Sequence, residues 1–253
     1  MPQAAERKAL ERSLKKLNEN TITLAELSEI AIRKAVYGLD RLDPGVADDV
    51  FILDQEIYAL QVEIEKTCVD LLALHAPVAR DLRTITTCLK ITTDLDRIGR
   101  YAKDIAELVL QFHAKEPNPA GTLGKIPRMA EVAVDLVDRA TRAFVERDAE
   151  SVRHIEEDDD AVDLLHDEIF QEIVAQMKAG ALDIEVGARY ILVTRYLERI
   201  ADHAVNIGQR VVYMVTGDLA PRVRAAERAK GRPPARDGGP RGSTGDNHRG
   251  TDK

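Results

Sequence analysis

The stretch VTRYLERIADHAVNIGQRVVYM, residues 193–214, decides the fold of this chain. Its apolar residues recur at alternating steps of four and three, a spacing that keeps one seam of an α-helix against partner helices. The seam consists of Val193, Leu197, Ile200, Ala204, Ile207, Val211 and Met214. Beside it, Glu198, Asp202 and Asn206 follow at steps of four, so their side chains line one edge of the same helix. An apolar seam with a polar ladder beside it is therefore the pattern to look for elsewhere.

The same pattern occurs 102 residues earlier in the chain. The earlier seam consists of Ile91, Leu95, Ile98, Ala102, Ile105, Val109 and Phe112. The earlier ladder consists of Asp96, Arg100 and Asp104. Further upstream the halves match at a shift of 105, and the change of shift falls in a turn near residues 178–182, where insertions and deletions are tolerated. We therefore interpret the chain as a tandem duplication.

The composition and the helix breakers predict three helices in each half. Aromatic residues make up 4% of the chain, Trp is absent and charged residues reach 32%, which is typical of a helical bundle. Asp43-Pro44-Gly45 and Ala76-Pro77 end two helices of the first half. Short turns make consecutive helices antiparallel neighbours. The expected fold is all-α: two antiparallel three-helix bundles in tandem, with six long helices and a disordered C-terminal tail.

Four segments follow from this pattern. We expect a first three-helix repeat over 1–114, a Pro/Gly linker over 115–127, a second repeat over 128–216 and a tail over 217–253. The tail has nine Lys/Arg and five Asp/Glu, a net charge of +4, which leaves −12 for the rest of the chain. It has few apolar residues beyond alanine and cannot repay the entropy of ordering. We interpret it as an inert extension or as a weak electrostatic contact with an acidic partner or an anionic membrane surface.

Charge and hydropathy exclude several classes of protein. The net charge of −8 argues against a general nucleic-acid binder. No run approaches the roughly 18 apolar residues of a transmembrane helix, and the charged N-terminus lacks the apolar region of a signal peptide. Cys68 and Cys88 are too few for a disulfide framework, so we expect buried thiols. We therefore expect a cytoplasmic protein without membrane insertion.

Two segments of the repeat resemble the signature helix of the PhoU family. They are TDLDRIGRYAKDIAE, from Thr93 to Glu107, and RYLERIADHAVNIGQ, from Arg195 to Gln209. The upstream stretches LDQEIYAL, HAPVARDLR and DDDAVDLL are similar to the rest of that family's repeat. The resemblance covers roughly residues 10–216 with both copies in register.

The resemblance implies a non-catalytic cytoplasmic regulator of phosphate homeostasis. Members of the family repress phosphate uptake and the phosphate-starvation response by coupling the phosphate ABC transporter to a sensor kinase. The implied partners are therefore the ATPase subunit of that transporter, a phosphate sensor histidine kinase and a second copy of the chain in a homodimer. Nucleic acid is not among them.

The resemblance also implies metal ions held by an acid-x-x-x-Asp motif on the third helix of each repeat. Glu198 and Asp202 match this motif fully, whereas Arg100 stands at the second acidic position after Asp96. The metal would be divalent or iron (Fe, Zn, Mn or Mg), with the choice left open. A metal site in the second repeat is expected more strongly than one in the first.

The second helix of each half offers further carboxylates. Carboxylates at i and i+4 lie near enough to bridge a hard cation. Asp159 and Asp163 complete the set in the second repeat, and Asp54 and Tyr58 are the equivalent residues in the first. Asn206, Asp104 and Arg100 are expected around these ligands rather than among them, and Arg100 is able to neutralise Asp96 and Asp104 instead of a metal. A solvated helix face is the alternative for each ladder, and His203 is expected on the surface.

Three rival functions have distinct requirements. A ferritin-like di-iron oxidase needs Glu-x-x-His pairs, which are absent; the nearest spacing is Asp163 to His166. A metal-dependent phosphohydrolase needs a positioned base and a substrate cleft, and neither a phosphate loop nor a nucleophile motif is present. A paralogue that regulates another transporter fits the altered first repeat and the long tail. We expect a regulator that is not an enzyme.

Overall fold

The computed structural model describes residues 2–112 and 124–218, and within them the chain forms six α-helices and no strand. The predicted all-α fold is confirmed. The helices are α1 (Pro2–Arg41), α2 (Pro44–His75), α3 (Ala79–Gln111), α5 (Lys125–Glu146), α6 (Ile155–Lys178) and α7 (Ile184–Thr216). Most of the expected linker and nearly all of the expected tail lie outside the described residues.

Capping side chains and prolines mark the boundaries of the helices. Asp43 caps α2, with its side chain accepting from the Gly45 amide at 2.9 Å, and Pro44 occupies the first turn, where its missing N–H costs nothing. Ala76 ends α2 in the left-handed conformation. Asp183 caps α7 by accepting from the amides of the next turn. The turns therefore lie where the sequence places them.

Two boundaries differ from the expected ones. Helix α5 begins at Lys125, so the last residues of the predicted linker, through Pro127, are helical. Proline near a helix start is compatible with the first turn because the amides there have no intrahelical acceptor. Helix α3 ends at Gln111, one residue before the last residue of the predicted seam, Phe112. Small shifts of this kind are ordinary at helix ends.

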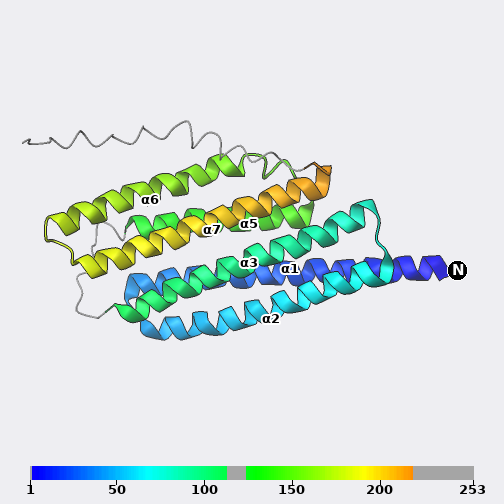
Figure 1. Ribbon diagram of the computed structural model, residues 1–253, viewed down its shortest axis with the longest axis horizontal. Helices are drawn as coiled ribbons and strands as arrows, with labels where there is room; N and C mark the ends of the chain where they lie inside the picture. Colours follow the sequence, from blue (N-terminus) through cyan, green and yellow to red (C-terminus); the bar gives the residue numbers. More distant parts are fainter. Residues whose placement is uncertain (1, 113–123, 219–253) are drawn as a thin grey trace, which may run out of the picture. The chain divides into compact units, whose positions relative to one another are not determined.

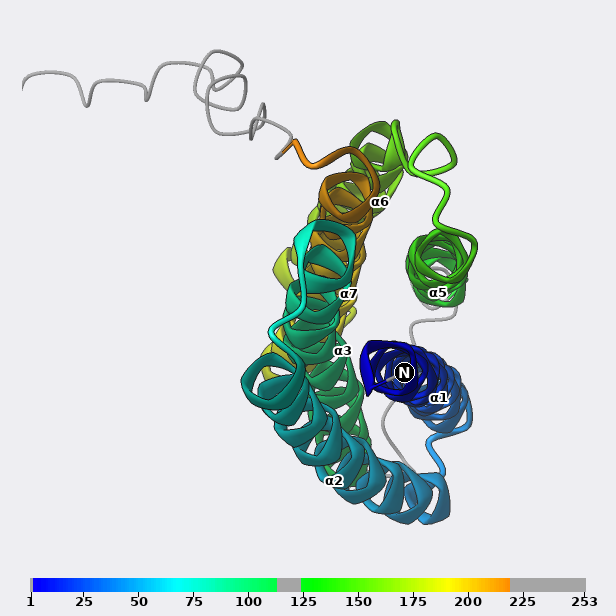
Figure 2. The same ribbon diagram turned by 90° about the vertical axis from the view of Figure 1, so that its right-hand side faces the viewer.

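The helices pack in two layers (Figures 1 and 2). Figure 2 shows α2, α3, α7 and α6 side by side in one layer, with α1 and α5 against its inner face. Each repeat's three helices contact one another, and the repeats meet through α3 against α7 and α1 against α5. The duplicated third helices therefore form the middle of the fold, as Figure 1 shows.

Both seams are buried at this junction. Every seam residue of α3 and α7 is at most 7% exposed, which confirms the periodicity argument. Aromatic rings join the two helices: Phe112 packs on Tyr190 with ring centroids 4.8 Å apart, and Tyr101 stacks on Tyr196 at 5.8 Å. The seams therefore hold the repeats to each other as well as to their own bundles.

The expectation that His203 is a surface residue is wrong. Its side chain is 14% exposed, and its Nδ1 lies 2.8 Å from Oδ1 of Asp94 on α3. Its ring also stacks on Tyr101, with centroids 5.8 Å apart. The error has a physical cause, because the outer edge of α7 is covered by α3 of the other repeat, and the pattern of one helix does not reveal its neighbour.

The two cysteines are free and buried, as expected. Burial raises the pKa of the Cys68 thiol to about 12, and burial followed by repulsion from Cys68 raises the pKa of Cys88 to about 12. Because thiolates are the reactive form, these residues are packing groups in the first repeat.

Candidate functional site

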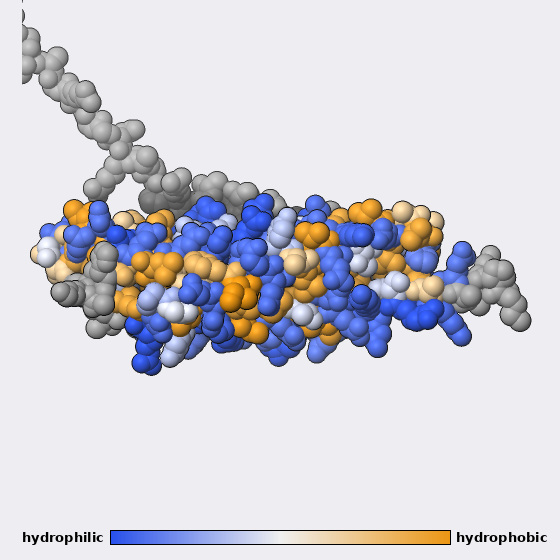
Figure 3. Space-filling model, turned by 90° about the horizontal axis from the view of Figure 1, so that it is seen from below, coloured by the Kyte–Doolittle hydropathy of each residue, from blue (hydrophilic) through white to orange (hydrophobic). Residues whose placement is uncertain are grey.

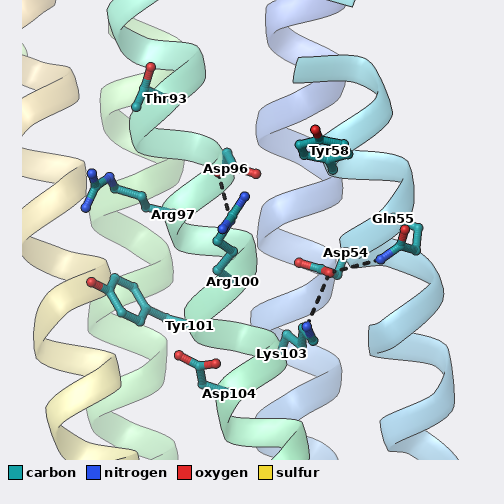
Figure 4. Close-up of a pocket in the computed structure, with 10 residues that line it drawn as sticks. All are labelled: Asp54, Gln55, Tyr58, Thr93, Asp96, Arg97, Arg100, Tyr101, Lys103 and Asp104. Atoms are coloured by element: carbon teal, nitrogen blue, oxygen red, sulfur yellow. Dashed lines mark hydrogen bonds and ion pairs between the residues drawn. The ribbon is translucent and has the colours of Figure 1, made fainter. Parts of the chain in front are cut away.

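A polar groove in the first repeat contains every residue of its predicted ladder. The groove lies between α2 and α3 and has a volume of about 800 Å³. Figure 4 shows the ten side chains that line it. They are Asp54, Gln55, Tyr58, Thr93, Asp96, Arg97, Arg100, Tyr101, Lys103 and Asp104. The repeat therefore assembles its acidic residues as the spacing indicates, but together with three cations.

Basic side chains bind two of the three carboxylates in this groove. Arg100 Nε lies 3.0 Å from Oδ2 of Asp96, as the sequence suggested. Lys103 Nζ lies 3.8 Å from Oδ2 of Asp54, which also accepts a hydrogen bond from Gln55 (Figure 4). Within the described chain Asp104 makes no ion pair, so Arg100 neutralises one acid rather than two. Protein cations thus stand where a metal would need free carboxylate oxygens.

Burial controls the protonation of two acids in the groove. Desolvation raises the pKa of Asp96, and Arg100 opposes that rise. Desolvation also raises the pKa of Asp104, with repulsion from Glu107 acting in the same direction. The groove therefore holds its carboxylates at some cost, which the charge of Arg100 reduces at both.

The second repeat places its acids on α6 and α7. Asp159 is fully buried, Glu198 is 7% exposed, and Asp163 and Asp202 are partly exposed. The carboxylate of Glu198 accepts a hydrogen bond from Arg195 Nη1, one turn earlier on α7. Asn206 is partly exposed further along the same helix. The carboxylates of this repeat are therefore buried or partly buried rather than fully exposed to solvent.

His166 is a residue of this region that the sequence argument set aside. Its Nε2 lies 3.9 Å from Oε2 of Glu198, and its Nδ1 lies 3.0 Å from Oγ1 of Thr194. The Thr194 hydroxyl donates its hydrogen to the Ile191 carbonyl at 2.9 Å, so Nδ1 donates to Thr194 and Nε2 is left to face Glu198. Helical spacing contained the signal, because His166 lies three residues after Asp163 and seven after Asp159.

The donor chemistry of the two repeats fits a metal ion differently. Among residues 2–112 and 124–218, no three His, Cys, Asp or Glu side chains lie close enough together to hold a metal. In the second repeat, four Asp/Glu carboxylates and the imidazole of His166 are of the ligand types that Zn, Fe and Mn accept. In the first repeat Arg100 and Lys103 lie beside the acids. The donor types of the second repeat therefore suit a cation better than those of the first.

The outer helices also differ in surface character. Helix α2 exposes Ile52, Val62 and Val69, and Figure 3 shows hydrophobic patches among hydrophilic ones on the side seen from below. On α6 the first two of these positions are Glu157 and Asp167. In the described part of the chain, no helix combines the length and the hydropathy needed to cross a membrane. The repeats therefore present different faces to a partner.

Comparison with known proteins matches both repeats to one family. The family model described as the PhoU domain matches residues 21–109 and again 126–211. These two ranges contain both ladders and all but the last residue of each seam, and the gap between them contains most of the predicted linker.

Individual relatives and solved structures agree with this match. The Mycobacterium tuberculosis protein named phosphate-specific transport system accessory protein PhoU homolog 1 is 34% identical over 78% of this chain and 88% of its own length. The Synechocystis protein named phosphate-specific transport system accessory protein PhoU homolog is 33% identical over 84% of this chain and 93% of its own length. The crystal structure of the phosphate transport system regulatory protein PhoU from Streptococcus pneumoniae has a TM-score of 0.77, with 28% identity over 84% and 99%. That of PhoU from Pseudomonas aeruginosa has a TM-score of 0.77, with 29% identity over 82% and 99%.

Proposed function

This chain belongs to the PhoU family, and on that premise we propose that it is a non-catalytic cytoplasmic regulator that represses phosphate uptake and phosphate-starvation signalling. The observation that carries the proposal is that both repeats match the family over most of the chain, with relatives named as accessory proteins of phosphate transport. The regulator acts by contact with the ATPase subunit of the phosphate transporter and with the cytoplasmic part of a sensor histidine kinase. It does so as a homodimer.

The arrangement of the helices supports regulation by contact. The outer helices differ at equivalent exposed positions, because Ile52 and Val62 on α2 correspond to Glu157 and Asp167 on α6. The repeats share the buried α3–α7 junction, so a partner bound to one repeat changes the packing felt by the other. One chain is therefore able to connect a transporter subunit with a kinase.

A metal ion in the second repeat belongs to this proposal. Glu198 and Asp202 on α7 and Asp159 and Asp163 on α6 would hold the ion. The ion would stiffen this face and add positive charge to it. We assign it no catalytic role, because the chain offers no nucleophile motif beside these carboxylates. The first repeat uses the Arg100–Asp96 ion pair in place of a metal. Asp54 therefore pairs with Lys103 rather than with an ion.

The proposal is tested by measuring binding of the full chain, and of a chain ending at Thr216, to the ATPase subunit and to the kinase's cytoplasmic part. We expect micromolar or tighter binding that survives removal of residues 217–253 and persists at high salt. Binding that disappears with those residues would assign the contact to the basic extension. Absence of binding to both partners by a folded, metal-loaded chain would reject this client assignment.

A paralogue with another client is the second candidate. Mycobacterium tuberculosis contains proteins named homolog 1 and homolog 2, which are 34% and 32% identical to this chain. Two such proteins in one organism support the idea that the family serves more than one role. The test is a pull-down of the tagged full chain from its host. Recovery of another transporter's ATPase without the phosphate ATPase subunit would favour the paralogue.

A further inference from the structure

Three arginines gather where the first turns of α3 meet the ends of α5 and α7. Arg80 and Arg83 lie on α3, and Arg147 is the residue that caps the C-terminus of α5. Figures 1 and 2 show the beginning of α3 beside the end of α7. Within the described residues, none of the three has a carboxylate oxygen within 4.0 Å, although most charged groups that line the first-repeat groove are paired. The cluster therefore carries uncompensated positive charge.

Two of these guanidinium groups are held in place by neutral oxygens. Arg147 Nη2 donates to Oγ1 of Thr84 at 3.0 Å, and Thr84 in turn donates to the Arg80 carbonyl at 3.1 Å. Arg83 Nε donates to the Met214 carbonyl at 3.3 Å. Each contact uses one or two of the five N–H groups of an arginine, so further donors stay available on both side chains. The cluster is positioned but not saturated.

The acid closest in sequence to the cluster is paired with another cation. Asp81 lies between Arg80 and Arg83 in sequence, and its carboxylate binds Arg7 from α1. Burial lowers the pKa of Arg147, repulsion from Arg80 and Arg83 acts in the same direction, and attraction to Asp81 acts against it. The net effect opposes a cation at this place, so the fold holds three like charges together at a cost that an anion would reduce.

The duplicated scaffold does not require this cluster. At the equivalent end of the other repeat, the matching residues are Leu182, Glu185 and Leu42. Leu42 adopts the same left-handed backbone conformation as Arg147, with φ of 50° against 56°. The backbone therefore tolerates an uncharged side chain here, and the arginines are a property of one end only.

From these observations we propose that Arg80, Arg83 and Arg147 form a binding site for a tetrahedral oxyanion, a phosphate group with two or more free oxygens. Guanidinium groups match such oxygens geometrically and donate charge-assisted hydrogen bonds to them. The phosphate group comes either from inorganic phosphate or from the headgroup of an anionic lipid. This site is independent of the metal site and of the partners proposed above, since it shares no residue with them.

The first experiment titrates the full chain with inorganic phosphate by calorimetry in a phosphate-free zwitterionic buffer. We expect Arg83→Gln and Arg147→Gln to weaken binding about tenfold each, the loss of a charge-assisted hydrogen bond. Arg97→Gln is the matched control, because Arg97 is exposed on the same helix and the charge change is equal. It is expected to leave affinity within about twofold, and sulfate is expected to compete with phosphate.

One further variant and a second binding assay distinguish the possible results. Arg80 is exposed and its side chain makes no hydrogen bond or ion pair within the described residues, so Arg80→Gln tests the cluster without disturbing α7 or Thr84. Thermal unfolding checks that each variant is folded. In the other arm, the same chains are sedimented with phosphatidylcholine vesicles that contain or lack phosphatidylglycerol.

Binding of either probe that falls with the cluster variants and not with Arg97→Gln supports the site. Binding of inorganic phosphate would identify free phosphate as the ligand. Binding of only the phosphatidylglycerol vesicles would identify the lipid headgroup as the ligand. Failure of both probes to bind a folded chain would overturn the proposal, and so would binding that all four variants leave unchanged. Loss of transporter or kinase binding has no bearing on either result, so the two proposals fail separately.

Discussion

The polar edges of the two repeats carry different charged side chains on the same arrangement of helices. In the first repeat Arg100 binds Asp96 and Lys103 lies near Asp54, so protein cations fill the groove. In the second, Asp202 stands in place of Arg100, and His166 faces the buried Glu198. The buried seams of α3 and α7, by contrast, kept their pattern throughout. Packing constrains a seam, whereas a polar edge is free to change its charged side chains.

The largest expected difference between the repeats lies in their junction. Tyr190 is buried against Phe112, and its equivalent in the first repeat is the smaller Cys88. Tyr190→Ala should lower the free energy of unfolding by about 3–5 kcal/mol through the cavity it leaves. Cys88→Ala should cost only about 1 kcal/mol. Urea denaturation with unchanged m-values measures both, and equal costs would show that the junction does not depend on the aromatic pair.

Exchanging one residue between the ladders tests the comparison directly. Asp202→Arg should lower metal retention by the second repeat about tenfold or more, since it removes a ligand and adds a cation. Arg100→Asp should give the first repeat an acid-x-x-x-acid pair and raise the bound metal. Elemental analysis of untagged protein after dialysis provides the measurement. Arg97→Asp is the matched control for added charge on α3, and equal gains from both changes would remove the case for a specific site.

The smallest expected effect concerns α1 against α5. Burial, with repulsion from Asp138, raises the pKa of Glu29 to about 7, and its equivalent in the second repeat is the buried Val134. The folded chain therefore holds this proton more tightly than the unfolded chain, so stability falls as pH rises from about 4.5 to about 7. Glu29→Gln should stabilise the protein by about 1 kcal/mol at pH 8, after allowance for solvent screening, and hardly at pH 5.

Urea unfolding at the two pH values measures this difference. Glu6→Gln serves as the control, because Glu6 is exposed on the same helix and is not among the charges that act on Glu29. A gain from Glu29→Gln that is equal at pH 5 and pH 8 would contradict the assignment of the raised pKa. The contact between the repeats would then have no dependence on this proton.

The sequence alone determined the helices, the duplication and the buried seams. Periodic apolar residues dictate which face of a helix is buried, and Pro44, Pro77 and Asp183 end or start helices through local backbone chemistry. The ladder of Asp96, Arg100 and Asp104 also follows from spacing within one helix, and the structure places it in one groove with Asp54 of α2. These features depend on neighbours a few positions away.

Only the tertiary structure decided which charged groups meet. His166 reaches Thr194 across 28 residues, His203 reaches Asp94 across 109, and Arg147 reaches Thr84 across 63. Such contacts depend on the crossing and rotation of separate helices, and helical periodicity specifies a face but not what lies opposite it. Long charged side chains also choose among several partners within reach. The fold was therefore predictable from the sequence, whereas the pairing inside its polar sites was not.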